Sequence, residues 1–127
     1  ICKKDDLKEA KQTALQQEHA EIHDPLTSLA NRNLFFSRLT NLTKQLHRYD
    51  RHHAILYIDL DFFKKINDKH GHYVGDKVLQ LFASRLIDNI RTGDTAARLS
   101  GDEFAIILEE IISEKAQLVS QKLLNEM

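Results

Sequence analysis

The chain has 127 residues, of which 42% are hydrophobic and 29% charged, and its net charge is -1. This composition predicts one globular domain, and the near-neutral charge gives no reason to expect binding to a nucleic acid polymer. The single cysteine, Cys2, excludes an internal disulfide and fits a reducing compartment, so we expect a cytoplasmic location. No apolar run approaches the ~20 residues of a membrane span, so we expect no direct membrane insertion of this segment, which also fits the cytosolic portion of a membrane-anchored receptor.

The first 22 residues are polar, rich in Lys, Glu, Gln and Ala, and free of Gly and Pro, which predicts a helix. A partial heptad spacing of apolar residues leaves two interpretations open, a dimeric coiled coil and a single solvated helix. Pro25 ends the helix, and the sequence Asp24-Pro25-Leu26-Thr27-Ser28 predicts a turn. We therefore assign residues 1–23 to a linker or signalling helix and residues 24–127 to the domain itself.

A second helix begins after Asn31, whose side chain can cap it. Its spacing places five apolar residues on one side: Leu34, Phe35, Leu39, Leu42 and Leu46. The near-continuous apolar run 54–60 predicts a buried strand. Gly71 and Gly75 then bracket a predicted loop.

Helical spacing returns after this loop in Val78, Leu79, Phe82, Leu86 and Ile90. Residues 95–99 and 103–108 predict a β-hairpin around a tight turn, Ser100-Gly101-Asp102. Ser113 caps a last amphipathic helix that carries Ala116, Val119, Leu123 and Met127. The order of elements predicts an α/β (α+β) domain, with a mainly antiparallel sheet flanked by helices.

Two pairs of carboxylates stand beside these predicted strands. Asp59 and Asp61 share one face at the end of the first strand, because side chains alternate along a strand. If the hairpin pairs with that strand, its turn brings Asp102 and Glu103 close to Asp59. Clustered carboxylates suit Mg²⁺, and two such ions assist phosphoryl or nucleotidyl transfer from a nucleoside triphosphate. The alternative is a turn that is acidic without function, but the pairing of the two motifs favours a shared metal site.

Four linked segments resemble the GGDEF family of diguanylate cyclases in their order and spacing. They are residues 24–32, residues 59–67, Gly71-His72-Tyr73-Val74-Gly75-Asp76 and Ser100-Gly101-Asp102-Glu103-Phe104. The resemblance covers about residues 24–127. It implies a ferredoxin-like fold similar to the palm of nucleotidyl cyclases and polymerases. It also implies that two GTP molecules are condensed into cyclic di-GMP and two pyrophosphates, with Mg²⁺ or Mn²⁺, in a homodimer controlled by an upstream sensor domain.

The resemblance assigns a metal site and a base site to individual residues. Asp59 and Asp102 match the metal-binding carboxylates, with the backbone carbonyl of Leu60 as a further ligand. Asn67 and Asp76 match residues that hydrogen-bond guanine, which discriminates strongly because unpaired polar groups are costly. His72 lies in the same substrate-contacting loop.

The segment Phe62-Phe63-Lys64 matches the turn whose amides hold the triphosphate, as helix N-termini hold anions. Lys64 is expected to offset the developing phosphate charge. Asp102 and Glu103 are both candidates for the base that accepts the proton of the attacking 3′-hydroxyl group, and the sequence does not separate these roles.

Arg91 and Asp94 match the family's RxxD site, at which cyclic di-GMP inhibits the enzyme. Arginine can fork onto a guanine edge or a phosphate, and aspartate can accept from the base. The competing interpretation is structural, because an arginine at a helix end followed by a Gly-Asp turn is common. The spacing from Ser100 favours the inhibitory site.

The chain departs from the family pattern in two ways. Ser100 replaces the first glycine of the signature, where glycine leaves most room and tolerates positive φ. Family domains also continue with a further strand, a small hairpin and a helix whose basic residues grip the phosphates, and we expect the chain to lack these. The alternative function is therefore a degenerate module that binds GTP or cyclic di-GMP and regulates a neighbouring domain.

Other residues are expected to be structural. The seven histidines have no cysteine partners in a metal-binding spacing, so a zinc site is disfavoured. Tyr57, Phe82 and Phe104 are expected to pack in the core.

Overall fold

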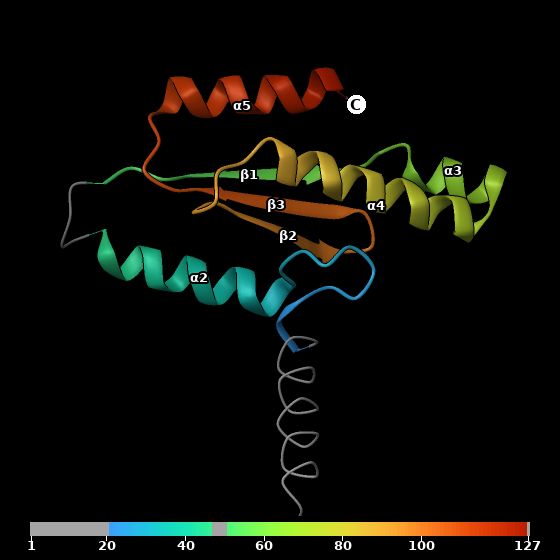
Figure 1. The fold of residues 1–127 in the computed structure, drawn as a ribbon, viewed down its shortest axis with the longest axis horizontal. Coiled ribbons are helices and arrows are strands. Elements are labelled where there is room, and N and C mark those ends of the chain that lie inside the picture. Colours follow the sequence, from blue (N-terminus) through green and yellow to red (C-terminus); the bar gives the residue numbers. More distant parts are fainter. Residues whose placement is uncertain (1–20, 47–50, 127) are drawn as a thin grey trace, which may run out of the picture.

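The computed structural model describes residues 21–46 and 51–126 (Figure 1). The elements in chain order are α2 (Arg32–Gln45), β1 (Ala54–Asp59), α3 (Phe63–His70), α4 (His72–Asp88), β2 (Thr95–Ser100), β3 (Glu103–Leu108) and α5 (Ser113–Glu126). The predicted N-terminal helix and its coiled coil fall outside the described residues, except for residues 21 and 22, which are helical. Within the two described ranges, no helix combines the length and apolarity needed to cross a membrane.

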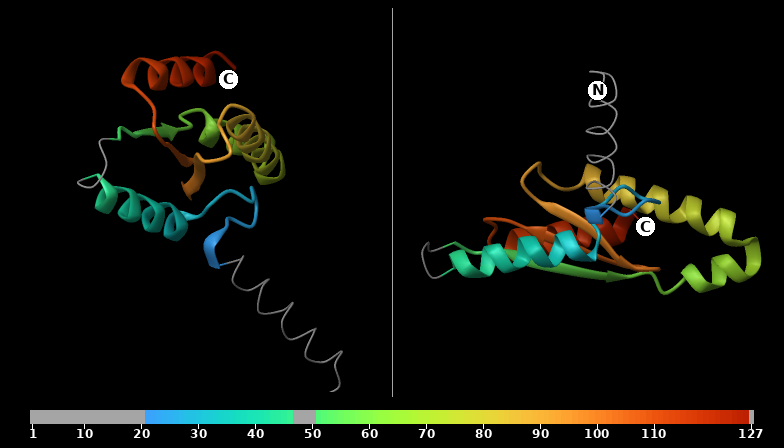
Figure 2. Two further views of the ribbon diagram at one scale, coloured as in Figure 1. Left: turned by 60° about the vertical axis from the view of Figure 1, so that its left-hand side comes forward. Right: turned by 90° about the horizontal axis from the view of Figure 1, so that it is seen from below.

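The three strands form one antiparallel sheet in the order β1-β3-β2, so β3 is the central strand. The predicted hairpin is confirmed as β2 and β3, and the α+β class is confirmed as well. Being central, β3 pairs on both edges, and its residues from Phe104 to Leu108 are all buried. Helices cover both faces of the sheet, with α2 on one side and α4 and α5 on the other (Figure 2).

Alternation along β3 divides the core into two clusters. Ala105 and Ile107 face α2 and pack with Phe35. Phe104, Ile106 and Leu108 face the other side, where α4 and α5 lie, and there the largest cluster forms. Phe82 and Phe104 meet edge to face in that cluster, with ring centroids 4.9 Å apart, so their predicted core positions are confirmed.

The prediction that the first strand is buried is wrong for one of its faces. β1 alternates between half-buried and exposed residues, and Ile55 and Tyr57 are 49% and 62% exposed. The reason is that α2 packs mainly against β2, the other edge strand, and leaves this face of β1 uncovered. The face of β1 that carries Tyr57 and Asp59 is therefore open to solvent.

The helix boundaries confirm one prediction and correct two. Asn31 caps α2 as expected, since its Oδ1 accepts from the Leu34 N–H at 3.0 Å. Leu46 lies at the C-cap and is exposed, so it does not join the apolar side of α2. The predicted loop between Gly71 and Gly75 is instead the first turn of α4, and only Gly71, with φ of 88°, breaks the helical path.

Candidate active site

The pairing of β1 with β3 sets the geometry of the acidic cluster. Asp59, the last residue of β1, lies directly opposite Glu103, the first residue of β3. The Leu60 N–H donates to the Asp102 carbonyl at 3.0 Å, which fixes the hairpin turn beside the end of β1. The expected approach of the turn to Asp59 is therefore present in the structure.

Negative charge is concentrated around Asp59. Its pKa is raised from the ordinary value, first by desolvation and then by the charges of Asp102, Asp61 and Glu103. Like charges at short range disfavour ionisation, so these four carboxylates form one electrostatic unit.

Glu103 has a partner that the sequence did not reveal. The Tyr57 hydroxyl donates to Glu103 Oε2 at 2.8 Å, across the β1–β3 ladder. This hydrogen bond, with a smaller contribution from Ser100, holds the pKa of Glu103 below its ordinary value. The same bond is the main cause that raises the pKa of Tyr57. The prediction that Tyr57 packs in the core is wrong, because its strand face is exposed.

The donor set fits a divalent cation, although it is not pre-assembled. No group of three or more His, Cys, Asp or Glu side chains in residues 21–46 and 51–126 already stands in metal-binding geometry. The crowding of charge on Asp59 is, however, the kind of repulsion that a cation relieves, and carboxylate oxygens are hard ligands. The Leu60 carbonyl accepts from the Phe63 N–H at 3.1 Å and keeps a second lone pair.

Helix α3 begins just beyond the acidic cluster. Phe62 is its N-cap residue and makes no side-chain cap. The Phe63 N–H already donates to the Leu60 carbonyl, which leaves the next N–H groups of the first turn to face an anion. Lys64 lies in this first turn and is exposed. The Phe63 side chain packs against the core, so any contact that residue 63 makes with a ligand must come from its backbone.

Asn67 lies on α3 against Gly75 of α4. A Cβ added at Gly75 would stand 1.8 Å from Asn67 Oδ1, so only glycine allows this contact. Asn67 Oδ1 is buried and has no hydrogen-bond partner within the described residues. A buried acceptor without a partner is uncommon and indicates a missing donor. Asp76 follows Gly75 and is exposed, as is His72, which is the first residue of α4 rather than a loop residue.

The Arg91–Asp94 turn is closed by its own side chains. Asp94 Oδ2 accepts from the Arg91 N–H at 3.0 Å, and Oδ1 accepts from the Glu109 N–H at 3.0 Å. The Arg91 guanidinium contacts both Asp94 oxygens at 3.3 Å and donates to the Glu109 carbonyl. The Asp94 side chain is only 2% exposed, against 58% for Arg91, so a ligand here would meet Arg91 first.

A cavity of about 380 Å³ adjoins Arg91 and Asp94, and Lys115 of α5 also lines it. The Arg91–Asp94 turn precedes β2, whereas the turn Ser100–Asp102, called the acidic turn below, follows it. The structure therefore places Arg91 and Asp94 at the opposite end of β2 from Asp102.

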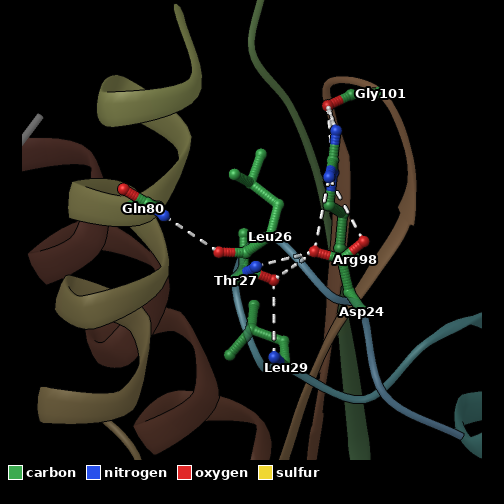
Figure 3. A network of polar contacts seen from close by, with 7 residues as sticks. All are labelled: Asp24, Leu26, Thr27, Leu29, Gln80, Arg98 and Gly101. Atoms are coloured by element: carbon green, nitrogen blue, oxygen red, sulfur yellow. Dashed lines mark hydrogen bonds and ion pairs between the residues drawn. The ribbon is translucent and has the colours of Figure 1, made fainter. Parts of the chain in front are cut away.

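A second ion pair, missed by the sequence analysis, stands behind the acidic turn (Figure 3). Arg98 Nη1 lies 3.2 and 3.3 Å from the two carboxylate oxygens of Asp24, and Arg98 Nε and Nη2 donate to the Gly101 carbonyl at 3.3 and 3.0 Å. Asp24 also accepts from the backbone and the hydroxyl of Thr27, both at 2.8 Å. The signal was the charged Arg98 inside an apolar strand, since such a residue needs a partner.

Several known proteins are similar to this chain in sequence. The family model described as "Diguanylate cyclase, GGDEF domain" matches residues 21–127. The bifunctional diguanylate cyclase/cyclic di-GMP phosphodiesterase MucR of Pseudomonas aeruginosa is 42% identical over 106 residues, which cover 84% of this chain and 16% of MucR. The diguanylate cyclase TpbB of the same species is 43% identical over 110 residues, 83% of this chain and 25% of TpbB. The chain thus spans a quarter or less of these relatives.

Solved structures agree with the fold. The GGDEF domain of TpbB from Pseudomonas aeruginosa superposes with a TM-score of 0.79 at 40% identity, over 83% of this chain and 62% of that one. The coiled coil and GGDEF domain of DgcB from Caulobacter crescentus, solved in complex with c-di-GMP, gives a TM-score of 0.86 at 26% identity, over 92% of this chain and 61% of that one.

Proposed function

The chain belongs to the GGDEF family of diguanylate cyclases, and from this premise we propose that it condenses two GTP molecules into cyclic di-GMP and two pyrophosphates. The observation that carries the proposal is the placement of Asp59 opposite Glu103, with Asp102 tied to the end of β1. In this proposal Asp59, Asp102 and the Leu60 carbonyl hold Mg²⁺ or Mn²⁺. The bound ion would supply charge neutralisation at the phosphates.

The remaining residues bind and orient GTP. The backbone amides at the start of α3, in the segment Phe62 to Lys64, hold the phosphates, and the Lys64 ammonium offsets their charge. Asn67 and Asp76 hydrogen-bond guanine, with His72 beside them. The Asn67 amide, which lies against Gly75, carries both an acceptor and donors of the kind that a guanine edge can pair with.

In each of two steps, the 3′-hydroxyl oxygen of one GTP attacks the α-phosphorus of the other. A phosphorus–oxygen bond forms, the bond to pyrophosphate breaks, and the hydroxyl proton passes to Asp102 or Glu103. The lowered pKa of Glu103 keeps it ionised but also makes it a weaker base. Each domain holds one GTP, so the reaction requires two domains facing each other as a homodimer, an encounter that an upstream sensor can control in the cytoplasm.

Product inhibition is proposed at Arg91 and Asp94, with cyclic di-GMP in the adjoining cavity. Because both carboxylate oxygens of Asp94 already accept hydrogen bonds from Arg91 and Glu109, Arg91 would make the first contact with the ligand.

A second candidate is a degenerate module that binds nucleotide without turnover, for which Ser100 is the reason. The backbone argues against it. Ser100 ends β2, and the only non-glycine residues with positive φ in the described ranges are Ser28 and Glu110. Serine therefore causes no backbone strain at this position, and its side chain helps to lower the pKa of Glu103.

The test is an incubation of the full-length protein with GTP and Mg²⁺, with cyclic di-GMP measured by mass spectrometry. We expect product from the wild type and a loss of about 10²-fold or more in Asp102→Asn, the scale of removing one transition-state stabiliser. Asp88→Asn, an exposed acid at the end of α4, is the matched control and keeps wild-type activity. Tight GTP binding without product in the wild type would select the degenerate module instead.

A further inference from the structure

The acidic turn is held by hydrogen bonds and not by packing. A Cβ at Gly101 would meet nothing within 4 Å, and a cavity of about 380 Å³ lies beside the turn, lined by Asn31, Arg32, Ser100 and Gly101 among others. Two anchors remain. The Leu60 N–H holds the Asp102 carbonyl on the β1 side, and Arg98 holds the Gly101 carbonyl on the other side.

The ladder is irregular where Arg98 acts. Arg98 lies opposite Phe104 and Ser100 lies opposite Glu103, so one extra residue, Leu99, is inserted between them. Such bulges bend a strand and redirect the side chains that follow. The bulge leaves the last residues of β2 without a regular ladder, which makes the Arg98 contact with Gly101 more important.

Arg98 is itself fixed by Asp24. Their side chains are 17% and 15% exposed, and Asp24 lies 74 positions earlier in the chain. Thr27 orients the Asp24 carboxylate with two hydrogen bonds, so the contacts run in series from Thr27 through Asp24 and Arg98 to Gly101 (Figure 3). Arginine can serve two acceptors at once because its donors form a rigid planar fork.

We propose that Asp24 and Arg98 are positioning residues that set the place of the Ser100–Asp102 turn for GTP turnover. Only the kinetic consequence of this positioning role rests on the proposed function. Displacing a reacting group by about 1 Å can cost up to about 10²-fold in rate. Neither residue contacts the phosphates in this proposal, so the effect falls on kcat and leaves the KM for GTP nearly unchanged.

Two substitutions in the full-length protein test the kinetic consequence. Arg98→Lys keeps the charge but cannot bond both Asp24 and Gly101 as a fork, and Arg98→Met removes the donors. Each is expected to lower kcat about tenfold or more at a temperature where the variant is folded, with KM within about threefold of wild type. Arg38→Met is the matched control, because Arg38 Nη1 bonds Thr95 Oγ1 at 2.8 Å at the other end of β2. It is expected to keep kcat.

A double-mutant cycle tests whether Asp24 acts through Arg98. The kcat of Asp24→Asn with Arg98→Met should match that of Arg98→Met alone, since contacts in one network are not additive. Independent, multiplicative losses would overturn the series arrangement.

Amide hydrogen exchange of the segment 100–103 judges the proposal separately from activity. Arg98→Met should speed exchange there, and Arg38→Met should not. If the wild type makes no cyclic di-GMP, the proposed function fails while this measurement still decides the positioning role. Unchanged exchange at 100–103 in Arg98→Met, or an unchanged kcat, would overturn the inference.

Discussion

Asn67 Oδ1 occupies the space into which a side chain at position 75 would grow, 1.8 Å from the position of a Cβ on Gly75. This contact ties α3 to α4 at the point where guanine is proposed to bind. Glycine within a helix is otherwise unfavourable. Its presence in α4 is explained by the space that Asn67 needs.

Gly75→Ala is therefore expected to displace the Asn67 side chain. The clash involves the end of a flexible side chain, and alanine favours a helix over glycine by about 1 kcal/mol, so the free energy of unfolding should change little. Affinity for a non-hydrolysable GTP analogue should fall about tenfold or more, as measured by calorimetry, because unpaired polar groups in the site weaken recognition. Gly93→Ala, where a Cβ meets nothing within 4 Å, is the control and should bind the analogue as the wild type does. Equal affinities in the two variants would contradict the role of Asn67.

The stability of the domain should depend on pH through Asp24. Burial alone would raise the pKa of its carboxyl group, but hydrogen bonds from Thr27 and the charge of Arg98 outweigh burial and lower it. A carboxyl group with a lowered pKa in the folded state stabilises the fold above its unfolded pKa, about 3.9, and loses that contribution as the pH falls through the folded pKa.

Urea unfolding of the wild type and Asp24→Asn measures this contribution. We expect Asp24→Asn to cost about 1.5–3 kcal/mol at pH 7, the range for hydrogen bonds to charged groups. The difference should shrink steadily below about pH 4. A difference that stays constant down to pH 2.5, or grows, would contradict the assignment.

Substitutions at Asp94 and Arg91 should have different effects, the first mainly on stability and the second mainly on ligand binding. Asp94→Ala removes a buried carboxylate that accepts from two backbone N–H groups, and should cost about 1–3 kcal/mol in urea unfolding. The Arg91 side chain is already 58% exposed, so Arg91→Ala should lower the free energy of unfolding by less. It should, however, weaken cyclic di-GMP binding in calorimetry. Unchanged cyclic di-GMP affinity in Arg91→Ala would show that this turn is not the inhibitory site.

Tyr57→Phe isolates the hydrogen bond to Glu103. Tyr57 is exposed, so stability should change by no more than about 0.5 kcal/mol. The pKa of Glu103 should rise toward its ordinary value, because the hydroxyl favours the charged carboxylate. NMR titration of the Glu103 carboxyl carbon without divalent cations measures this shift. An unchanged or lower pKa of Glu103 would show that Tyr57 does not hold it.

Local signals in the sequence predicted much of the fold. Asn31 was recognised as a cap from its type and position, and the β2–β3 hairpin from its turn residues. The approach of Asp102 to Asp59 followed from strand pairing, because a hairpin beside a strand brings their ends together. These features depend on neighbours in sequence or on a single pairing.

The errors concern features that depend on distant residues. The exposure of Tyr57 is set by α2, which covers β2 and leaves β1 open, and composition does not show which of the two edge strands a helix will cover. Gly75 was interpreted as part of a loop, because the feature that explains a glycine in this helix, the Asn67 side chain, lies on another helix. The pair of Asp24 and Arg98 joins positions 74 residues apart, and no spacing rule connects them.

Asp59 and Asp102 are proposed to share a divalent cation, and Mn²⁺ binding to the full-length protein with a non-hydrolysable GTP analogue measures this. In electron paramagnetic resonance titrations, the wild type should bind Mn²⁺ saturably, and Asp59→Asn and Asp102→Asn should each weaken binding about tenfold or more. Asp68→Asn, an exposed acid on α3, should bind as the wild type does. Equal Mn²⁺ affinity in Asp59→Asn and Asp68→Asn would contradict the account.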